Sequence, residues 1–215
     1  MNGQRAIERA NALLPGRLTL PADALALVLL AHAGATPEAG GDALASELGK
    51  AGLGSLKVDL LRDSEERFAD LHHNVTLLAR RLLDDLKSIT WRMFLGELPT
   101  LPIGLCAAGD CSPVALRVAA LRDKDVFAVV CRSGLIDLAG TLYLRSLTAP
   151  LLVFVADDDE RVVASNRRAL RELSCRKELM LLPSGGEVSD PVTVGQCLAR
   201  ETTRWFVRNL PIRTA

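Results

Sequence analysis

The sequence predicts an α/β protein, a three-layer sandwich in which helices cover both faces of a mostly parallel sheet. The first observation is an alternation along the chain, in which short apolar runs typical of strands are separated by longer segments with helical spacing of their apolar residues. The second is size, because 215 residues with 49% hydrophobic side chains suffice for one large core. No linker or internal repeat interrupts this order, so we expect one domain over residues 1–215, without a sizeable cap domain.

Two extended segments are expected before the first helix. Residues 17–21 form the first, and the strongly apolar run 25–31 forms the second. A continuous apolar run indicates a central strand, because both of its faces are covered. A loop at 32–37 follows, and a helix is expected over residues 38–50.

Glycines at positions 52 and 54 are expected to end this helix, and a strand follows at 56–60. The next helix is the clearest in the chain, because seven apolar residues recur at three- and four-residue steps and make one apolar face that would pack on a sheet. These residues are Phe68, Leu71, Val75, Leu78, Leu82, Leu86 and Ile89.

The rest of the chain continues the same alternation. Four further strands are expected at residues 102–106, 126–131, 151–155 and 178–182. Three further helices are expected at residues 114–121, 160–173 and 194–209.

A strand, a sharp turn and a helix are predicted over residues 102–116, and the tip of the turn holds Gly109. In the α/β-hydrolase elbow, with the pattern G-x-S-x-G, the nucleophile lies on a strained turn, and small flanking residues let the strand and helix approach closely. Here the five residues are Ala107, Ala108, Gly109, Asp110 and Cys111. The frame for a nucleophile is present, and the attacking atom is missing.

Three segments make the chain resemble the dienelactone-hydrolase-like branch of the α/β-hydrolases. The loop that begins at His32 reads His-Ala-Gly-Ala in place of H-G-x-G. Arg132 is followed by Ser-Gly-Leu-Ile-Asp-Leu-Ala-Gly at 133–140. Residues 149–159, together with Asn166 and the residues after it, are similar to the strand, acid turn and helix of that branch.

The resemblance covers residues 18–210 and implies a nucleophile, an acid and a histidine, in that chain order. Carried over position by position, the nucleophile falls on Gly109, the acid on Asp159 and the histidine on Glu187. Two of the three positions therefore carry a different residue type, and the triad is expected to be degenerate.

The resemblance also implies a pocket above the sheet. Backbone groups of an oxyanion-hole-like site are expected at Ala33, Gly34 and Asp110. The rim of the pocket is expected to hold His32, Arg62 and Arg132.

The position of the histidines bears on catalysis, because a general base must lie within hydrogen-bond reach of its nucleophile. No histidine follows His73, so the base of the family is absent. His72 and His73 follow the spacing of the clearest helix, so at least one of them should point away from a site at the top of the sheet. His32 is expected to anchor its loop by donating to a backbone carbonyl.

Cys111 offers an alternative nucleophile, because Gly109 to Pro113 also has the pattern G-x-C-x-P. That alignment needs a two-residue shift, and a reactive thiolate needs a lowered pKa. The favoured interpretation is that Cys111 begins the helix, with Pro113 in its first turn.

The acidic residues 157–160 raise the question of a metal site, because Asp110, Asp159 and Glu187 would converge above the sheet. The favoured interpretation is that the carboxylates lie in the first turn of a helix, where its partial positive charge stabilises them. No metal and no cofactor are expected.

Composition limits the expected partners. The 26 basic and 26 acidic side chains balance and form no basic block, so neither nucleic acid nor an anionic membrane is expected. The amino terminus lacks the pattern of a signal peptide, and five cysteines at irregular spacings are expected to be reduced core thiols, which favours the cytoplasm. The cysteines are Cys106, Cys111, Cys131, Cys175 and Cys197.

These observations favour a catalytically silent α/β-hydrolase homologue whose pocket binds a small molecule or an interaction partner. The alternative is an active hydrolase of small esters or lactones that uses Cys111 or an unrecognised nucleophile. A third possibility is a structural partner that forms a homo-oligomer through an exposed helix or edge strand.

Overall fold

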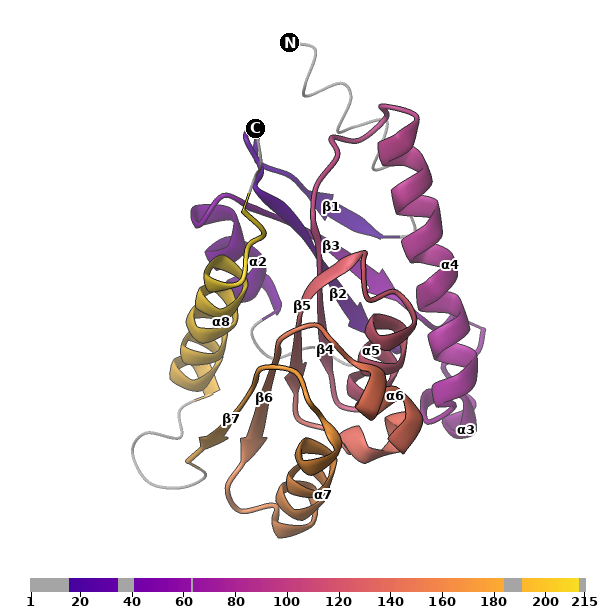
Figure 1. Ribbon diagram of the computed structural model, residues 1–215, viewed down its shortest axis with the longest axis vertical. Coiled ribbons are helices and arrows are strands. Elements are labelled where there is room, and N and C mark those ends of the chain that lie inside the picture. Colours follow the sequence, from indigo (N-terminus) through magenta and orange to yellow (C-terminus); the bar gives the residue numbers. More distant parts are fainter. Residues whose placement is uncertain (1–15, 35–40, 63, 184–190, 213–215) are drawn as a thin grey trace.

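The computed structural model describes residues 16–34, 41–62, 64–183 and 191–212. Its centre is a seven-stranded sheet in the order β1-β3-β2-β4-β5-β6-β7 (Figure 1). Strand β1 is antiparallel to β3, and every other neighbouring pair is parallel. The strands are β1 (Arg17–Thr19), β2 (Ala26–His32), β3 (Leu53–Asp59), β4 (Ile103–Ala108), β5 (Val126–Arg132), β6 (Leu151–Ala156) and β7 (Lys177–Leu182).

Helices cover both faces of this sheet, as the predicted three-layer sandwich requires (Figure 1). Helices α2 (Gly41–Lys50) and α8 (Pro191–Arg208) pack together on one face. The other face carries α4, α5, α6 and α7, with a short helix α3 before α4 and a 3-10 turn before α6. Their bounds are α3 (Ala69–His72), α4 (Val75–Phe94), α5 (Cys111–Leu121), α6 (Thr141–Ser146) and α7 (Glu160–Glu172), and the 3-10 turn covers Ile136–Ala139.

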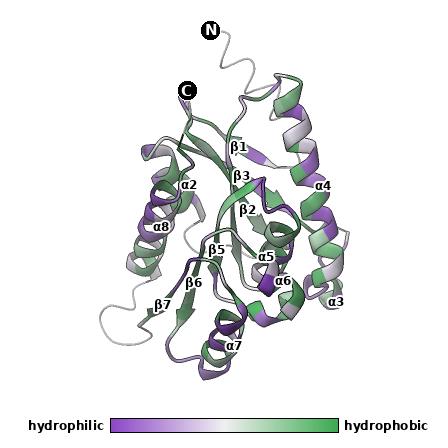
Figure 2. Ribbon diagram, viewed as in Figure 1, coloured by the Kyte–Doolittle hydropathy of each residue, from purple (hydrophilic) through white to green (hydrophobic). Residues whose placement is uncertain are grey.

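The alternation of side chains along β2 divides the interior into two cores. Leu27, Leu29 and Ala31 join the core under α4 and α5, whereas Ala26, Val28 and Leu30 join the core under α2 and α8. Because both faces of the strand are buried, its sequence is apolar at every position. Figure 2 shows that the central strands are hydrophobic along their length, whereas the helix α4 carries both hydrophobic and hydrophilic residues.

The long helix predicted from Phe68 to Ile89 is wrong in its first third, because the structure divides it into α3 and α4. Asn74 ends the continuity: its side chain accepts a hydrogen bond from the backbone N–H of Leu77 at 3.0 Å and caps α4. Phe68 consequently leaves the apolar face and is half exposed, whereas Leu78 to Ile89 keep their buried positions.

Gly54 does not end a helix, contrary to the prediction, because β3 begins at Leu53. A side-chain carbon at Gly54 would lie 2.5 Å from Leu20 Cδ1, so a larger residue at this position would require the Leu20 side chain to move. Gly52 does lie in the turn, with a φ of +74°. No helix within the described ranges is long and apolar enough to cross a membrane.

Candidate functional site

The turn between β4 and α5 has the backbone of a nucleophile elbow. Gly109 lies between Ala108, the last residue of β4, and the first turn of α5, with a φ of +53°. Its N–H donates to the carbonyl of Arg132 at 3.0 Å, so the tip is tied to the end of β5. A side-chain carbon at Gly109 would meet no atom of the described residues within 4 Å. The turn therefore holds open space at the place where a nucleophile would project.

Contacts from two other segments support the elbow. The Ser112 hydroxyl donates to the carbonyl of Ser133 at 2.7 Å. The side-chain amide of Asn166, a fully buried residue in the middle of α7, donates to the carbonyls of Gly134 and Val162, each at 2.8 Å. Ser133 itself has a φ of +66°, uncommon for a residue with a side chain. These contacts hold β4, β5 and α7 in one arrangement around the turn.

A pocket of about 290 Å³ opens above the elbow, at the carboxyl ends of β2 and β4. In doubly wound α/β folds, this edge of the sheet is where ligands bind. Its lining includes the three residues predicted for the oxyanion-hole-like site and the two alternative nucleophile positions. The lining residues are His32, Ala33, Gly34, His72, Ala108, Gly109, Asp110 and Cys111.

His32 and Asp59 shape the loop on one side of the pocket. Nδ1 of His32 lies 3.2 Å from the carbonyl oxygen of Gly34 and 3.8 Å from Oδ2 of Asp59. The Asp59 carboxylate accepts hydrogen bonds from the N–H groups of Gly34 and Leu61, both at 2.9 Å. The Gly34 N–H is thus already engaged and points at a carboxylate. Asp59 was not identified from the sequence, although its place at the end of a predicted strand beside the His32 loop was a usable signal.

The two adjacent histidines differ in their relation to the site, because only His72 lines the pocket. His72 lines the pocket, and its Nε2 lies 2.9 Å from the carbonyl oxygen of Glu66. His73 Nδ1 lies 3.0 Å from Oδ2 of Asp110, the residue after the elbow tip. The reason is the end of α3 at His72, after which the chain no longer follows helical spacing. His32 and His72 therefore line the pocket over the elbow, and His73 contacts the elbow through Asp110.

The expected acid, Asp159, is the N-terminal cap of α7. Its side chain accepts a hydrogen bond from the Val162 N–H at 3.0 Å, and the side chains of residues 157–160 are exposed. Glu187, the position of the expected histidine, lies outside the described residues. Within the part of the chain that the structure covers, no three His, Cys, Asp or Glu side chains are grouped in a way that would hold a metal ion.

Arg62 and Arg132, expected at the rim, are not among the residues that line this pocket. Arg62 is exposed, and its N–H donates to the Glu65 carboxylate at 3.0 Å. Glu65 in turn forms two parallel hydrogen bonds with Arg81, both at 2.7 Å, which hold the loop after β3 against α4. This clamp therefore ties the backbone of Arg62 to α4 through Glu65.

Cys111 is 1% exposed in the first turn of α5, although it contributes to the pocket lining. Cys106 and Cys131 are also buried, and Cys175 and Cys197 are half-buried. None of the five forms a disulfide within the described structure. Burial raises the pKa of the Cys131 thiol, and the Cys106 thiol nearby adds to that effect. The buried Cys131 thiol therefore lies in the environment of a structural rather than a reactive cysteine.

Comparison with known proteins adds the following similarities. No family model matches the chain. The crystal structure of dienelactone hydrolase from Anabaena variabilis is 31% identical, with a TM-score of 0.81 over 91% of this chain and 92% of that one. Est1E from Butyrivibrio proteoclasticus is 12% identical with a TM-score of 0.68 over 89% of this chain and 93% of its own, a likeness of fold alone.

Two curated proteins from Mycobacterium tuberculosis, strains CDC 1551 and H37Rv, are each 32% identical over 199 residues. Both carry the name "Putative phosphoribosyl transferase". The match includes 91% of this chain and 44% of each relative, so the chain spans less than half the length of these relatives.

Proposed function

The chain belongs to the dienelactone hydrolase family of α/β-hydrolase-fold proteins, and from that premise we propose that it has lost ester hydrolysis and binds a small molecule in the pocket over the elbow. One observation carries the proposal. The elbow backbone is intact, with Gly109 at a φ of +53°, while the space that a nucleophile would occupy is open. The pocket for a ligand is retained, but the tip of the elbow carries no nucleophile.

The missing base supports the same conclusion. The family order places the histidine at Glu187, and the sequence has no histidine after His73. A hydrolase site without its triad keeps only the effects of the oxyanion hole and of binding, about 10³- to 10⁴-fold over water. Here the Gly34 N–H, one expected oxyanion donor, is engaged by Asp59. Useful turnover is therefore not expected.

We assign the phosphoribosyl transfer named for the curated relatives to the part of those proteins that has no counterpart in this chain. The match covers 44% of their length. The match to the dienelactone hydrolase structure, in contrast, covers 92% of that chain, and its name describes a hydrolase. The family of the fold is therefore a better guide to this chain than the name of the longer relatives.

The competing function is an ester or lactone hydrolase with Cys111 as nucleophile, and one observation favours it. Cys111 and His72 line the same pocket, so a thiol and an imidazole occur together beside the elbow. Two observations oppose it: Cys111 is 1% exposed, and it lies two residues beyond the tip. An activated thiolate needs an accessible and electropositive setting.

The test is hydrolysis by the purified chain of 4-nitrophenyl acetate, 4-nitrophenyl butyrate and the lactone dihydrocoumarin, with Cys111→Ala as the matched variant. We expect the same background rate from both proteins. Turnover that disappears in Cys111→Ala would establish the competing function. Hydrolysis that persists in Cys111→Ala but disappears in Gly109→Phe, whose side chain would fill the pocket, would also contradict the proposal that the chain has lost ester hydrolysis.

Binding is tested separately by saturation-transfer NMR with dihydrocoumarin as the probe. We expect saturation transfer with the native chain and a clear loss with Gly109→Phe, because the new ring would occupy the open space above the elbow. An equal signal from both proteins would place the lactone elsewhere and contradict the binding role of this pocket.

A further inference from the structure

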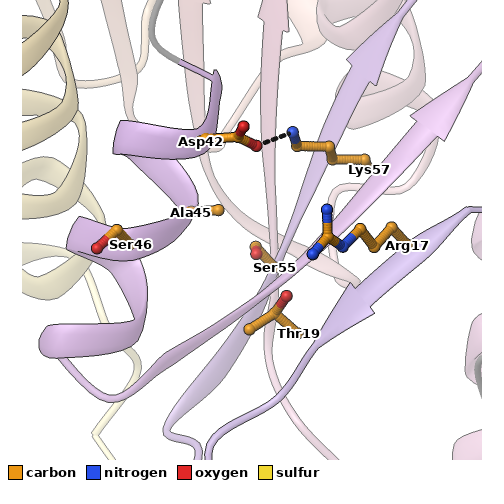
Figure 3. Close-up of a pocket in the computed structure, with 7 residues that line it drawn as sticks. All are labelled: Arg17, Thr19, Asp42, Ala45, Ser46, Ser55 and Lys57. Carbon is orange, nitrogen blue, oxygen red and sulfur yellow. Dashed lines mark hydrogen bonds and ion pairs between the residues drawn. The ribbon is translucent and has the colours of Figure 1, made fainter. Parts of the chain in front are cut away.

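A second pocket, of about 270 Å³, lies between α2 and the β1–β3 edge of the sheet (Figure 3). It shares no residue with the pocket over the elbow. Apart from one alanine, the side chains around it are polar or charged. The lining residues are Arg17, Thr19, Asp42, Ala45, Ser46, Ser55 and Lys57.

Two positive side chains are brought together here by strand register. Arg17 in β1 lies directly opposite Lys57 in the antiparallel pairing with β3. Leu18, the residue after Arg17 in β1, is 4% exposed and belongs to the core on the α4 side. Because neighbouring side chains of a strand point to opposite faces, burial of Leu18 places Arg17 on the α2 side. Like charges directly opposite one another destabilise a strand pair.

One carboxylate compensates part of this charge. Asp42 in the first turn of α2 accepts a hydrogen bond from Lys57 Nζ at 2.7 Å. That hydrogen bond, followed by the positive charge of Lys57, lowers the pKa of Asp42, so its carboxylate is ionised and engaged at neutral pH. The Arg17 side chain acts on Asp42 only through its charge, and its guanidinium has no hydrogen-bond or ion-pair partner among the residues described. The pocket keeps a net charge of one positive unit, because two cations face one anion.

Three hydroxyl groups complete the polar lining. Thr19 and Ser55 are register partners across β1 and β3, and Ser46 of α2 lines the outer part of the pocket. Figure 3 shows the Asp42–Lys57 pair at one end of the pocket, with Arg17, Thr19 and Ser55 close together on the strands and the Ser46 hydroxyl directed away from them. Ser55 is 2% exposed, so its backbone position is fixed by packing. A guanidinium fork with several hydroxyl donors suits an oxyanion that offers three acceptor oxygens.

We propose that this pocket binds a phosphoryl group, either free phosphate or the phosphate of a small monoester, between Arg17 and the hydroxyls of Thr19 and Ser55. A planar carboxylate offers two acceptor oxygens and would leave part of the donor set unused. Bound phosphate would neutralise the Arg17 charge that faces Lys57, so ligand binding would also stabilise the β1–β3 edge.

The test is titration calorimetry and thermal unfolding of the full chain at constant ionic strength, with inorganic phosphate, glycerol 3-phosphate and acetate as probes. We expect phosphate or its monoester to bind and raise the Tm, and acetate to do neither. Binding of phosphate alone identifies the free anion as ligand, and stronger binding of glycerol 3-phosphate identifies a monoester.

Arg17→Gln should weaken phosphate binding about tenfold or more, because it removes a charge-assisted contact. Ser46→Ala should weaken it less. Without phosphate, Arg17→Gln should unfold at the native temperature or above it, since it relieves the repulsion with Lys57. The matched control is Arg80→Gln, which removes the same charge from an exposed position on α4 and should bind phosphate normally.

Three results would overturn the proposal. The first is no binding of either phosphate probe to the native chain. The second is acetate binding as tight as phosphate binding. The third is an equal loss of affinity in Arg17→Gln and Arg80→Gln, which would mean a general effect of net charge.

Discussion

The carbonyl oxygen of Gly109 lies 2.1 Å from the place that a side-chain carbon on Gly134 would occupy. The loop after β5 therefore passes so close to the elbow that only a glycine fits at position 134. Gly109 is the opposite case, since a side-chain carbon there would meet nothing within 4 Å among the described atoms. Both residues have positive φ, +94° at Gly134 and +53° at Gly109, but only at position 134 do the surrounding atoms leave no room for a side chain.

The first prediction compares alanine at these two glycines. Gly109→Ala should lower the free energy of unfolding by about 1 kcal/mol, the usual strain of a side chain in the left-handed region. Gly134→Ala should cost about 3 kcal/mol or more, because the backbone must move in addition. Urea unfolding followed by circular dichroism measures both. Equal costs would mean that the two segments do not approach as closely as described.

The second prediction concerns Gly109→Ser combined with Glu187→His. The serine fits into open space at the elbow, and the pair restores the residue types of a triad beside Asp159. We expect weak hydrolysis of 4-nitrophenyl acetate by the double variant and background rates from each single variant. Activity of Gly109→Ser alone at the level of the pair would show that His32, His72 or His73 serves as base, contrary to the expectation from family order.

The third prediction is a pH dependence caused by Asp85 on α4. Burial, followed by the negative charge of Asp84, raises the pKa of Asp85 from 3.8 to about 6. The native state therefore keeps this proton to higher pH than the unfolded state, and stability falls as pH rises from about 4 to about 6. Asp85→Asn should gain about 1 kcal/mol above pH 7, a value reduced for partial exposure, and nothing below pH 4.

Urea unfolding of native and Asp85→Asn proteins at pH 4 and pH 7.5 checks this prediction. Asp123→Asn, at an exposed position, is the control and should show no such gain. A stabilisation by Asp85→Asn that is the same at both pH values would exclude titration of Asp85 as its cause.

The fourth prediction concerns the clamp between Glu65 and Arg81. The hydrogen bonds from Arg81, followed by the one from the Arg62 N–H, lower the pKa of Glu65 from 4.5 to about 2. The stabilisation by the clamp is therefore complete above pH 4.5 and is lost as pH falls toward 2. Glu65→Gln should lower the Tm at pH 7, and the difference from the native chain should shrink at pH 3. A Tm difference that stays constant over this range would refute the role of the charge.

Much of the fold was predictable because its strands are buried on both faces. The runs 25–31 and 151–155 are continuously apolar, and the structure places β2 and β6 there. The break between α3 and α4 was not predicted, because Phe68 and Leu71 continue the helical spacing of the residues after them. Asn74 before Val75 was the local signal, a capping residue that the longer periodic pattern concealed.

The candidate site was predictable only in its sequence-local part. The elbow at Gly109 and the loop at Gly34 follow from short motifs and lie together in the pocket. The approach of His73 to Asp110 could not be predicted, because it depends on how two segments far apart in the sequence meet after the chain folds. The close passage of Gly134 is of the same kind.

The contacts of Asn166 indicate that the backbone shape of the elbow does not depend on which side chain stands at its tip. The buried amide of Asn166 holds Gly134 in place, and Ser112 holds Ser133, without any contribution from a side chain at the tip. A mutation at position 109 can thus abolish a reaction while the chain continues to fold. Conversely, a mutation at Asn166 would damage the scaffold in an active or an inactive member alike, so folding alone is sufficient to maintain the backbone frame of the elbow.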